Sequence, residues 1–298
     1  MSSVPQYAFK AEDLVKDGRT TATNIQDVKR WMDSHPHIPQ MSEEQIALFL
    51  IACNNEVEAT QTTIGLYFKH KASSTELFTN RDIEDDDMQF TNKVTSYAFV
   101  PKRTKENYAI IVVSLKDSYY YNFNLELQTK MAFICIDRIL YLDPPDGLVV
   151  VLDFKEVGIM HLTRMKLGIL RKMFSFLQEA LPTQLKQIHI LNASYTFEKL
   201  LAICKPFMKK ELYEMIPKLN MYPSLIFFRS YHTLPTCQWK IFFEKFIPAS
   251  CMPSDFGGDL PPSEQLGDDF VNSCKTLKTF HKQDERQIQL YIENTKKK

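Results

Sequence analysis

Glycine is scarce in this sequence, and the phosphate-binding and nucleophile motifs that depend on it are missing. The 298-residue chain has 8 glycines. None of them completes a GxxxxGK[ST] loop, a GxGxxG turn or a GxSxG elbow. The one adjacent pair, Gly257 and Gly258 in "DFGGD", follows a loop rather than a strand. The sequence therefore contains no motif for a nucleotide-binding or serine-hydrolase site, although catalytic groups that meet only in three dimensions stay open.

An excess of charge of one sign is also absent. The chain has 36 basic and 36 acidic residues, which gives no reason to expect a nucleic-acid partner. No stretch approaches the roughly 18 to 20 apolar residues that span a bilayer. The N-terminal "MSSVPQYAFK" lacks the apolar core of a signal peptide. We therefore expect a soluble, cytoplasmic, monomeric protein that touches a membrane only transiently.

Paired cysteines and metal-ligand spacings are missing as well. None of the six cysteines forms a C-x-x-C pair, so we expect reduced thiols that pack as small apolar side chains. His35 and His37 resemble a metal pair, but Pro36 separates them and no further ligand is near. The acidic run at 84–87 lacks the alternating ligands and central glycine of a calcium loop. We predict no metal and no cofactor.

What the chain does contain begins with about ninety residues of helical pattern. "NIQDVKRWMDSHPH" places Ile25, Val28 and Met32 on one helical face. Ser42 stands three residues before Gln45, which is the spacing of a capping box. The acidic "RDIEDDDMQF" then marks a solvated connection. We predict an all-helical N-terminal module over residues 1–90.

From Asn107 the pattern changes to alternating strands and helices. "YAIIVVSL", "LVVVLDF" and "QIHIL" predict apolar strands, and "SLIFFRSYH" predicts a fourth. "NLELQTKMAFICIDRILYL" and "HLTRMKLGILRKMFSFLQEAL" predict helices between them, the second a single long helix ended by Pro182. This order indicates the α/β class, with parallel strand pairs covered on their faces.

Two polar residues stand on the predicted strands. Asp153 ends a strand, where α/β proteins often place function. Since no second carboxylate or histidine has a telling spacing, we favour a hydrogen-bonded structural aspartate over a metal ligand or general base. His189 lies on the strand face opposite Ile188 and Ile190, and a packing role is favoured over catalysis.

Apolar side chains are in excess on two helices. "YTFEKLLAICKPFM" places Phe197, Leu200, Leu201, Cys204 and Met208 on one face, and Ile203 and Phe207 widen it beyond an ordinary amphipathic stripe. "KMFSFLQEAL" adds Met173, Phe176, Leu177 and Leu181. Core packing explains any one of these residues, whereas the combination also suggests a hydrophobic pocket.

The same stretch resembles the CRAL-TRIO lipid-binding family. That family has a proline after a helix, a strand of the type I-H-I-I-N, an aromatic residue five positions on and then K-P-F-L. Here these are Pro182, residues 188–192, Phe197 and residues 205–208. "VVVLDF" and "MPSDFGGDL" resemble further blocks of the family, and the N-terminal helices resemble the module that precedes it. The layout is most similar to the tocopherol and retinaldehyde transfer branch in its divergent, insect-type form.

The resemblance implies an α/β fold in which a mixed sheet forms the floor of a cavity. Helices cover the sheet, and a mobile gate helix over about residues 192–215 closes the cavity. The lipid-binding domain would span 91–262, followed by a partly helical tail over 263–298. The implied ligand-binding residues are Phe133, Ile134, Leu148, Leu152, Met173, Phe176, Leu177, Leu181, Leu185, Ile188, Phe197, Leu200, Leu201, Cys204 and Met208.

The implied function is to bind a small hydrophobic molecule, such as a retinoid, tocopherol, carotenoid or other terpenoid, and to transfer it between membranes without catalysis. Ile203 and Phe207, at the edge of the gate, would meet the membrane. The alternatives are phospholipid or phosphoinositide exchange or signalling, lipid chemistry by Asp153 and His189, and an adaptor with a filled cavity.

The sequence departs from the branch at its phosphoinositide cleft. The matched positions are Gln184, Lys186, Glu211 and Met215, of which one is basic. Lys205, Lys209 and Lys210 are the substitutes for head-group contact, or else an ordinary solvated face.

Overall fold

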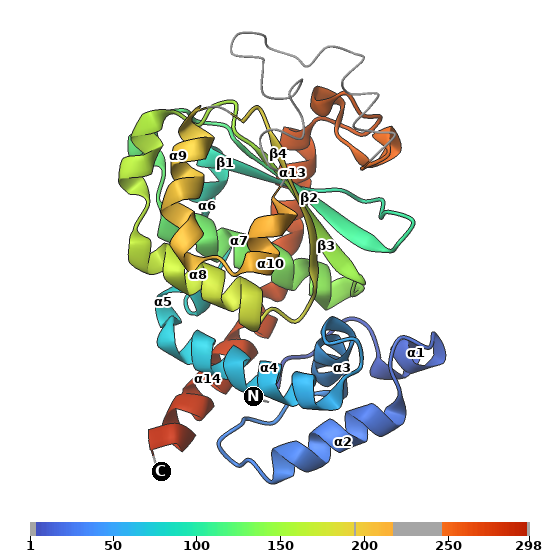
Figure 1. The fold of residues 1–298 in the computed structure, drawn as a ribbon. Helices are drawn as coiled ribbons and strands as arrows, with labels where there is room; N and C mark the ends of the chain where they lie inside the picture. The colour runs from blue at the N-terminus through green and yellow to red at the C-terminus, as the bar shows by residue number, and fades with distance from the viewer. Residues whose placement is uncertain (1–3, 194, 217–245, 297–298) are drawn as a thin grey trace.

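The computed structural model describes residues 4–193, 195–216 and 246–296. A helical module lies at the bottom of Figure 1 and an α/β body stands above it. The helices that precede the sheet are α1 (Ala11–Lys16), α2 (Ala22–Asp33), α3 (Glu43–Ala52), α4 (Val57–Ser73), α5 (Thr75–Phe78) and α6 (Asp86–Val94). The prediction of a helical N-terminal module is confirmed.

Local capping explains where two of these helices begin. The Thr21 hydroxyl accepts a hydrogen bond from the Asn24 amide at the start of α2 (3.1 Å). The Ser42 hydroxyl accepts one from the Gln45 amide at the start of α3 (3.2 Å). The Gln45 side chain does not complete the capping box but bonds Gln287 near the C-terminus (3.2 Å). Only one of the two hydrogen bonds of the predicted capping box therefore forms, because the second residue bonds a side chain from another part of the fold.

In the part of the chain that the structure describes, a four-stranded mixed sheet forms the centre of the α/β body. Its strands are β1 (Thr95–Phe99), β2 (Tyr108–Leu115), β3 (Gly147–Asp153) and β4 (Leu185–Leu191), in the order β1-β2-β3-β4. The first pair is antiparallel and the other two are parallel. The mixed α/β sheet is confirmed. The edge strand β1 was not predicted, and the strand predicted at "SLIFFRSYH" lies outside the described residues.

The crossover helices connect successive parallel strands along the chain. Helix α7 (Leu125–Leu142) joins β2 to β3, as predicted. Between β3 and β4 the prediction of one long helix is wrong, since a 3-10 turn η2 (Ile159–Arg164) precedes α8 (Leu167–Glu179). Arg164 donates to the Phe123 carbonyl (3.1 Å), and the buried His161 ring packs edge-on against Phe123. These contacts hold η2 against η1 (Tyr120–Asn122) and interrupt the helix.

Strand alternation divides the interior into two cores. Ala109, Ile111 and Leu148 pack with α7 and α8 in what we call the helix-side core. Ile110, Val149, Val151 and their neighbours face the other way and pack with Ile247, Cys251 and Met252 in what we call the back core. Period-two alternation places each set on its own face. His189, paired with Val151, lies on the back-core side as predicted.

The C-terminal segment packs back onto the body. After the turns η5 (Ala249–Cys251) and η6 (Ser254–Phe256), it forms α13 (Ser263–Ser273), η7 (Cys274–Leu277) and α14 (Lys278–Lys296). The Asp255 carboxylate accepts from the Ser263 amide (2.9 Å) and so fixes the start of α13. Gly258 follows at a point where any side chain would meet the Met252 carbonyl. The "DFGG" block is therefore a folding element rather than a phosphate loop.

A buried polar cluster joins three parts of the chain. The Lys71 ammonium lies 2.8 Å from Asp284, and Arg81 pairs with Asp137 (2.6 Å) and with Asp284. His281 contacts the Arg81 carbonyl through Nδ1 (3.0 Å). Burial raises the pKa of Asp137, but Arg81, His281 and Lys71 together outweigh that effect and hold the pKa well below its usual range. The cluster ties α4 to α7 and α14, and the sequence analysis missed it.

Candidate functional site

The segment predicted as a gate lies directly after β4 and covers one face of the sheet. It consists of α9 (Tyr195–Cys204), the 3-10 turn η3 (Lys205–Phe207) and α10 (Lys210–Met215). Figure 1 shows α9 and α10 beside α8 on the same side of the sheet. Pro206 cannot donate a backbone hydrogen bond, which explains why the apolar helix does not run on to Met215.

A polar contact fixes the chain where it enters the gate. The Asn192 amide nitrogen donates to the Asp153 carboxylate (2.7 Å), which also accepts from the Lys155 backbone (3.0 Å). Asn192 has φ +50°, a left-handed conformation that asparagine tolerates. Burial raises the pKa of Asp153. The predicted hydrogen bonding of Asp153 is confirmed.

The sheet face beneath the gate is apolar and incompletely covered. β3 lies between β2 and β4, yet Val150 and Leu152 on its helix-facing side are only half-buried. Their register partners Ile188 and Ile190 on β4 are also half-buried. On the back-core side, Val149 and Val151 have no exposed surface. We define the recess as the partly exposed apolar surface on the helix-facing side of the sheet, formed by Val150, Leu152, Ile188 and Ile190.

The predicted ligand-binding residues divide into two groups. Phe133, Ile134, Leu148, Phe176, Leu181, Phe197 and Cys204 are buried. Leu152, Met173, Leu177, Leu185, Ile188, Leu200, Leu201 and Met208 are half-buried.

The aromatic members of the buried group are occupied by protein contacts. The rings of Phe133 and Phe176 meet at 5.0 Å, and Phe197 packs edge-on against Phe154 at 5.0 Å. The half-buried group therefore provides most of the surface that a ligand could reach.

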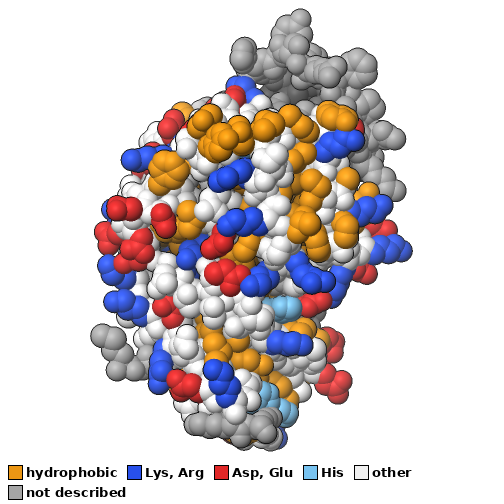
Figure 2. All heavy atoms as spheres, turned by 90° about the vertical axis from the view of Figure 1, so that its left-hand side faces the viewer, with side chains coloured by type: hydrophobic (Ala, Val, Ile, Leu, Met, Phe, Trp, Pro, Cys, Tyr) orange, Lys and Arg blue, Asp and Glu red, His pale blue; other side chains and the backbone are white. Residues whose placement is uncertain are grey.

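The two residues predicted at the membrane edge lie inward. Ile203 and Phe207 are half-buried and pack against the helix-side core. Exposed large apolar side chains occur instead at the start of α9, where Tyr195 is 59% exposed, and on η2, where Ile159 is 49% and Met160 47% exposed. Tyr119, Tyr121 and Leu167 are exposed as well. Figure 2 shows hydrophobic side chains gathered in a band along the upper part of this face.

The predicted head-group lysines have protein partners. Lys186 donates to Gln184 and lies over the Tyr108 ring (5.6 Å), and Lys205 lies over the Tyr213 ring (5.1 Å). Lys209 pairs with Glu179 (2.9 Å), and Lys210 with Glu214 (3.9 Å).

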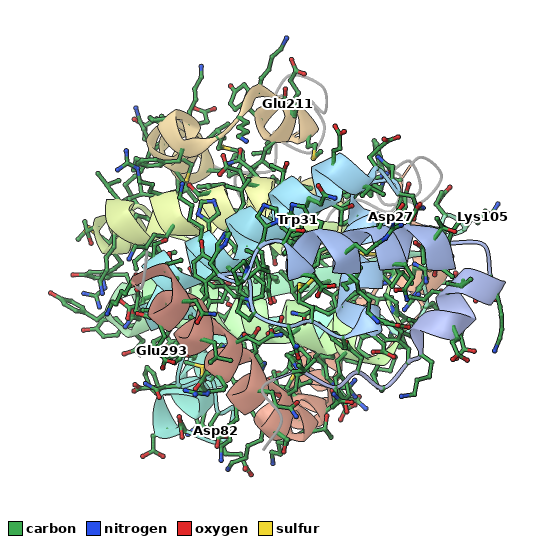
Figure 3. The ribbon with its side chains drawn as sticks, turned by 90° about the horizontal axis from the view of Figure 1, so that it is seen from below. Asp27, Trp31, Asp82, Lys105, Glu211 and Glu293 are labelled. Atoms are coloured by element: carbon green, nitrogen blue, oxygen red, sulfur yellow. The ribbon has the colours of Figure 1, made fainter. Side chains whose placement is uncertain are left out.

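The other positions matched to the phosphoinositide cleft are not basic and do not converge. Gln184 donates to the Ala52 carbonyl of the N-terminal module (2.8 Å). Glu211 and Met215 are exposed on α10, and Figure 3 shows Glu211 at the edge of the molecule. The structure therefore does not gather the four positions into a basic cleft.

Sequence reasoning missed several residues around the gate. Val150 and Ile190 line the recess but were not named, although strand alternation places them beside Leu152 and Ile188. Gln178 and Glu179 contact the chain after α9. No sequence signal indicates these last two, because they meet their partners only through the packing of α8.

The described residues were expected to contain no metal site and no membrane span. In the described ranges, no group of three or more His, Cys, Asp or Glu side chains is placed to hold a metal ion. The His35 ring instead contacts the Trp31 carbonyl at the end of α2 (2.8 Å). No helix of the described part is long and apolar enough to cross a membrane.

His189 gives a prediction for stability at acid pH. Burial lowers its pKa to about 4, against about 6.5 in an unfolded chain. The folding stability linked to the neutral His189 ring is therefore fully present above pH 6.5 and is lost as pH falls from 6.5 through 4. The total loss is about 3 kcal/mol. Urea denaturation between pH 7 and pH 4 will show a smaller loss of stability for His189→Gln than for the unmodified chain. Parallel pH profiles for the two proteins would refute this account.

Comparison with known proteins identifies the class. Residues 93–258 match the family described as "CRAL/TRIO domain", and residues 17–88 match the one described as "Pinta-like, UBA domain". Since the first match covers more than half of the chain, this protein belongs to the CRAL/TRIO family, whose members are generally non-enzymatic lipid-binding proteins.

Individual relatives are distant. The chain is 24% identical to the mouse (Mus musculus) "Alpha-tocopherol transfer protein-like" over 93 residues, which span 30% of this chain and 27% of that protein. It is 22% identical to "Clavesin-1" of Xenopus laevis over 267 residues, or 84% of this chain and 71% of that protein. The "Crystal structure of Sfh5" superposes with a TM-score of 0.39 at 12% identity, covering 58% of this chain and 62% of that one.

Proposed function

We propose that this protein binds one small hydrophobic molecule in the recess and transfers it between membranes. The observation that carries the proposal is the half-buried aliphatic floor of Val150, Leu152, Ile188 and Ile190 under a gate of helices. These side chains offer no hydrogen bond, so they select an apolar ligand by shape. The helical module over 1–90 and the tail over 263–298 flank the lipid-binding domain at 91–262.

The favoured ligand is a retinoid, tocopherol, carotenoid or other terpenoid. The floor is apolar, and the mouse relative is called alpha-tocopherol transfer protein-like. A ligand of about 30 heavy atoms that gains about 0.3 kcal/mol per atom would bind with roughly 9 kcal/mol, in the sub-micromolar range. That affinity suffices to carry a water-insoluble molecule and still permits release when the gate opens. No catalytic residue is needed for this function.

Membrane contact is assigned to the exposed apolar side chains at the start of the gate. Ile159 and Met160 on η2 and Tyr195 on α9 are exposed apolar side chains on neighbouring elements. Insertion of these side chains into the interfacial layer is favourable in proportion to the apolar area that they bury. This assignment replaces Ile203 and Phe207, which lie inward. Contact here is transient, because the three side chains offer far less apolar area than a membrane-spanning helix.

Phospholipid or phosphoinositide exchange is the second candidate, and the observations around the lysines weigh against it. Lys186, Lys205 and Lys209 all lie against neighbouring side chains. A phosphate group would have to displace these partners. A neutral terpenoid has no phosphate group and could bind without displacing these partners.

Mass spectrometry tests the proposal directly. The full chain, purified without detergent, is expected to retain a stoichiometric hydrophobic ligand that extraction and mass measurement identify. An isoprenoid or retinoid would support the terpenoid proposal, and a phospholipid would favour the second candidate. A protein that is empty and takes up no retinoid, tocopherol or fluorescent fatty acid would refute the carrier function.

A further inference from the structure

One glutamine at the end of α8 holds the turn between α9 and α10. The Gln178 side-chain nitrogen donates to the Phe207 carbonyl (3.0 Å), and its oxygen accepts from the Lys209 backbone. Between η3 and α10, Met208 and Lys209 have extended backbones, so these groups lie outside any regular helix. Gln178 therefore supplies to this turn the hydrogen bonds that a continuous helix would have made itself.

The next residue connects the same turn to the N-terminal module. One oxygen of Glu179 lies 2.9 Å from the Lys209 ammonium, and the other lies 2.9 Å from Nε2 of His70 on α4. The Lys209 and His70 hydrogen bonds together lower the pKa of Glu179, against a smaller effect of burial. One carboxylate thus joins the gate to α8 and to the helical module at once.

These contacts lie at one of the two ends at which the α9 segment is bonded to the rest of the protein. At the entry, Asn192 is bonded to Asp153; at the exit, Phe207 and Lys209 are bonded to Gln178 and Glu179. The α9 segment between them can leave the sheet only if at least one end is released. The entry continues directly from β4 and is bonded to the last residue of β3, whereas the exit is bonded to α8, so the exit can open without disturbing a strand.

We propose that Gln178 and Glu179 form a latch that holds the gate closed, and that His70 sets its strength from the N-terminal module. The ligand readout below rests on the proposed function, whereas the latch itself does not. His70 orients the Glu179 carboxylate so that its other oxygen faces Lys209. A change in the position of α4 would therefore alter how firmly the gate is held.

Hydrogen exchange of the full chain tests the latch without any ligand. In Gln178→Ala, the amides of residues 207–210 are expected to exchange about 10-fold faster, since two hydrogen bonds are lost. Lys209→Gln is expected to give a roughly 3-fold effect, in line with a partly exposed ion pair. His70→Ala should accelerate the same amides by about 2-fold.

Lys210→Gln is the matched control. Lys210 is the exposed neighbour of Lys209 and pairs at 3.9 Å with Glu214 within its own helix. Its substitution should leave exchange at 207–210 unchanged. Equal effects of Lys209→Gln and Lys210→Gln, or no effect of Gln178→Ala, would overturn the latch. Unchanged exchange in His70→Ala would overturn the coupling to the module.

Transfer kinetics give the functional readout. Protein loaded with a fluorescent fatty acid is mixed with phosphatidylcholine vesicles, and transfer from Gln178→Ala is expected to be several-fold faster than from Lys210→Gln. Equal rates would overturn control of release by the latch. Failure of every protein to bind the probe would count against the proposed function alone, because the exchange data judge the latch independently.

Discussion

Replacement of Asp284 by alanine is expected to lower the free energy of unfolding by about 3–5 kcal/mol, a larger loss than at any exposed ion pair. Asp284 is 1% exposed and accepts from Lys71 (2.8 Å), from Tyr67 (3.1 Å) and from Arg81. Its removal leaves two buried cations facing one remaining carboxylate, Asp137. Urea denaturation at pH 7 measures the change.

Two further variants sharpen this prediction. Asp268→Ala breaks the partly exposed pair with Lys116 (3.1 Å) and should cost about 1 kcal/mol or less. The double variant Asp284→Leu with Lys71→Met removes one charge of each sign and leaves Arg81 with Asp137, so it should be more stable than Asp284→Ala. A loss below about 1 kcal/mol in Asp284→Ala would show that the buried cluster does not hold the module to the body.

Filling the recess is expected to abolish ligand binding while sparing the fold. Val150→Phe adds a ring on the half-buried, helix-facing side of the central strand. The free energy of unfolding should change by less than about 1 kcal/mol, because the partly exposed side of Val150 gives the larger ring a direction in which to extend. Affinity for retinoid or fluorescent fatty acid should fall by about 100-fold or more, which fluorescence titration measures.

The adjacent valine is the control for that experiment. Val151 has no exposed surface and faces the back core, so Val151→Phe should overpack it and cost about 1–3 kcal/mol. It is expected to keep its ligand affinity under conditions where it is folded. If Val150→Phe were as destabilising as Val151→Phe, the recess would be too small to hold a ligand. If Val150→Phe bound ligand normally, the site would lie elsewhere.

The sequence predicted the repeating elements well and the irregular ones poorly. Apolar runs such as "LVVVLD" and "QIHIL" form β3 and β4, because strands that are covered on both faces consist of nearly continuous apolar residues. The edge strand β1 escaped notice, since its hydrogen bonds are made with β2 and its composition is mixed. The division of residues 159–179 into η2 and α8 depends on Arg164 and His161, whose partners lie about forty residues earlier.

At the site, strand and helix periodicity identified apolar residues of the lining. It gave no signal for Gln178 and Glu179, which contact the gate through the packing of α8. Leu152 and Ile188 follow from strand alternation, and so would Val150 and Ile190. The buried aromatic residues were included because helical periodicity reports which side chains point inward. It does not report whether they meet a ligand or each other, as Phe133 and Phe176 do.

By itself the sequence determined the class of this protein: a helical module followed by alternating apolar strands and helices, with the motif blocks of one lipid-binding family. Such information is local, because hydrophobic period and motif spacing are read within a few turns of chain. Only the tertiary structure decided the buried cluster around Asp284, the half-open floor of the recess and the contacts of Gln178 and Glu179 with the gate. These depend on side chains such as Lys71 and Asp284, 213 residues apart, whose meeting is set by how whole helices pack and not by the residues beside them.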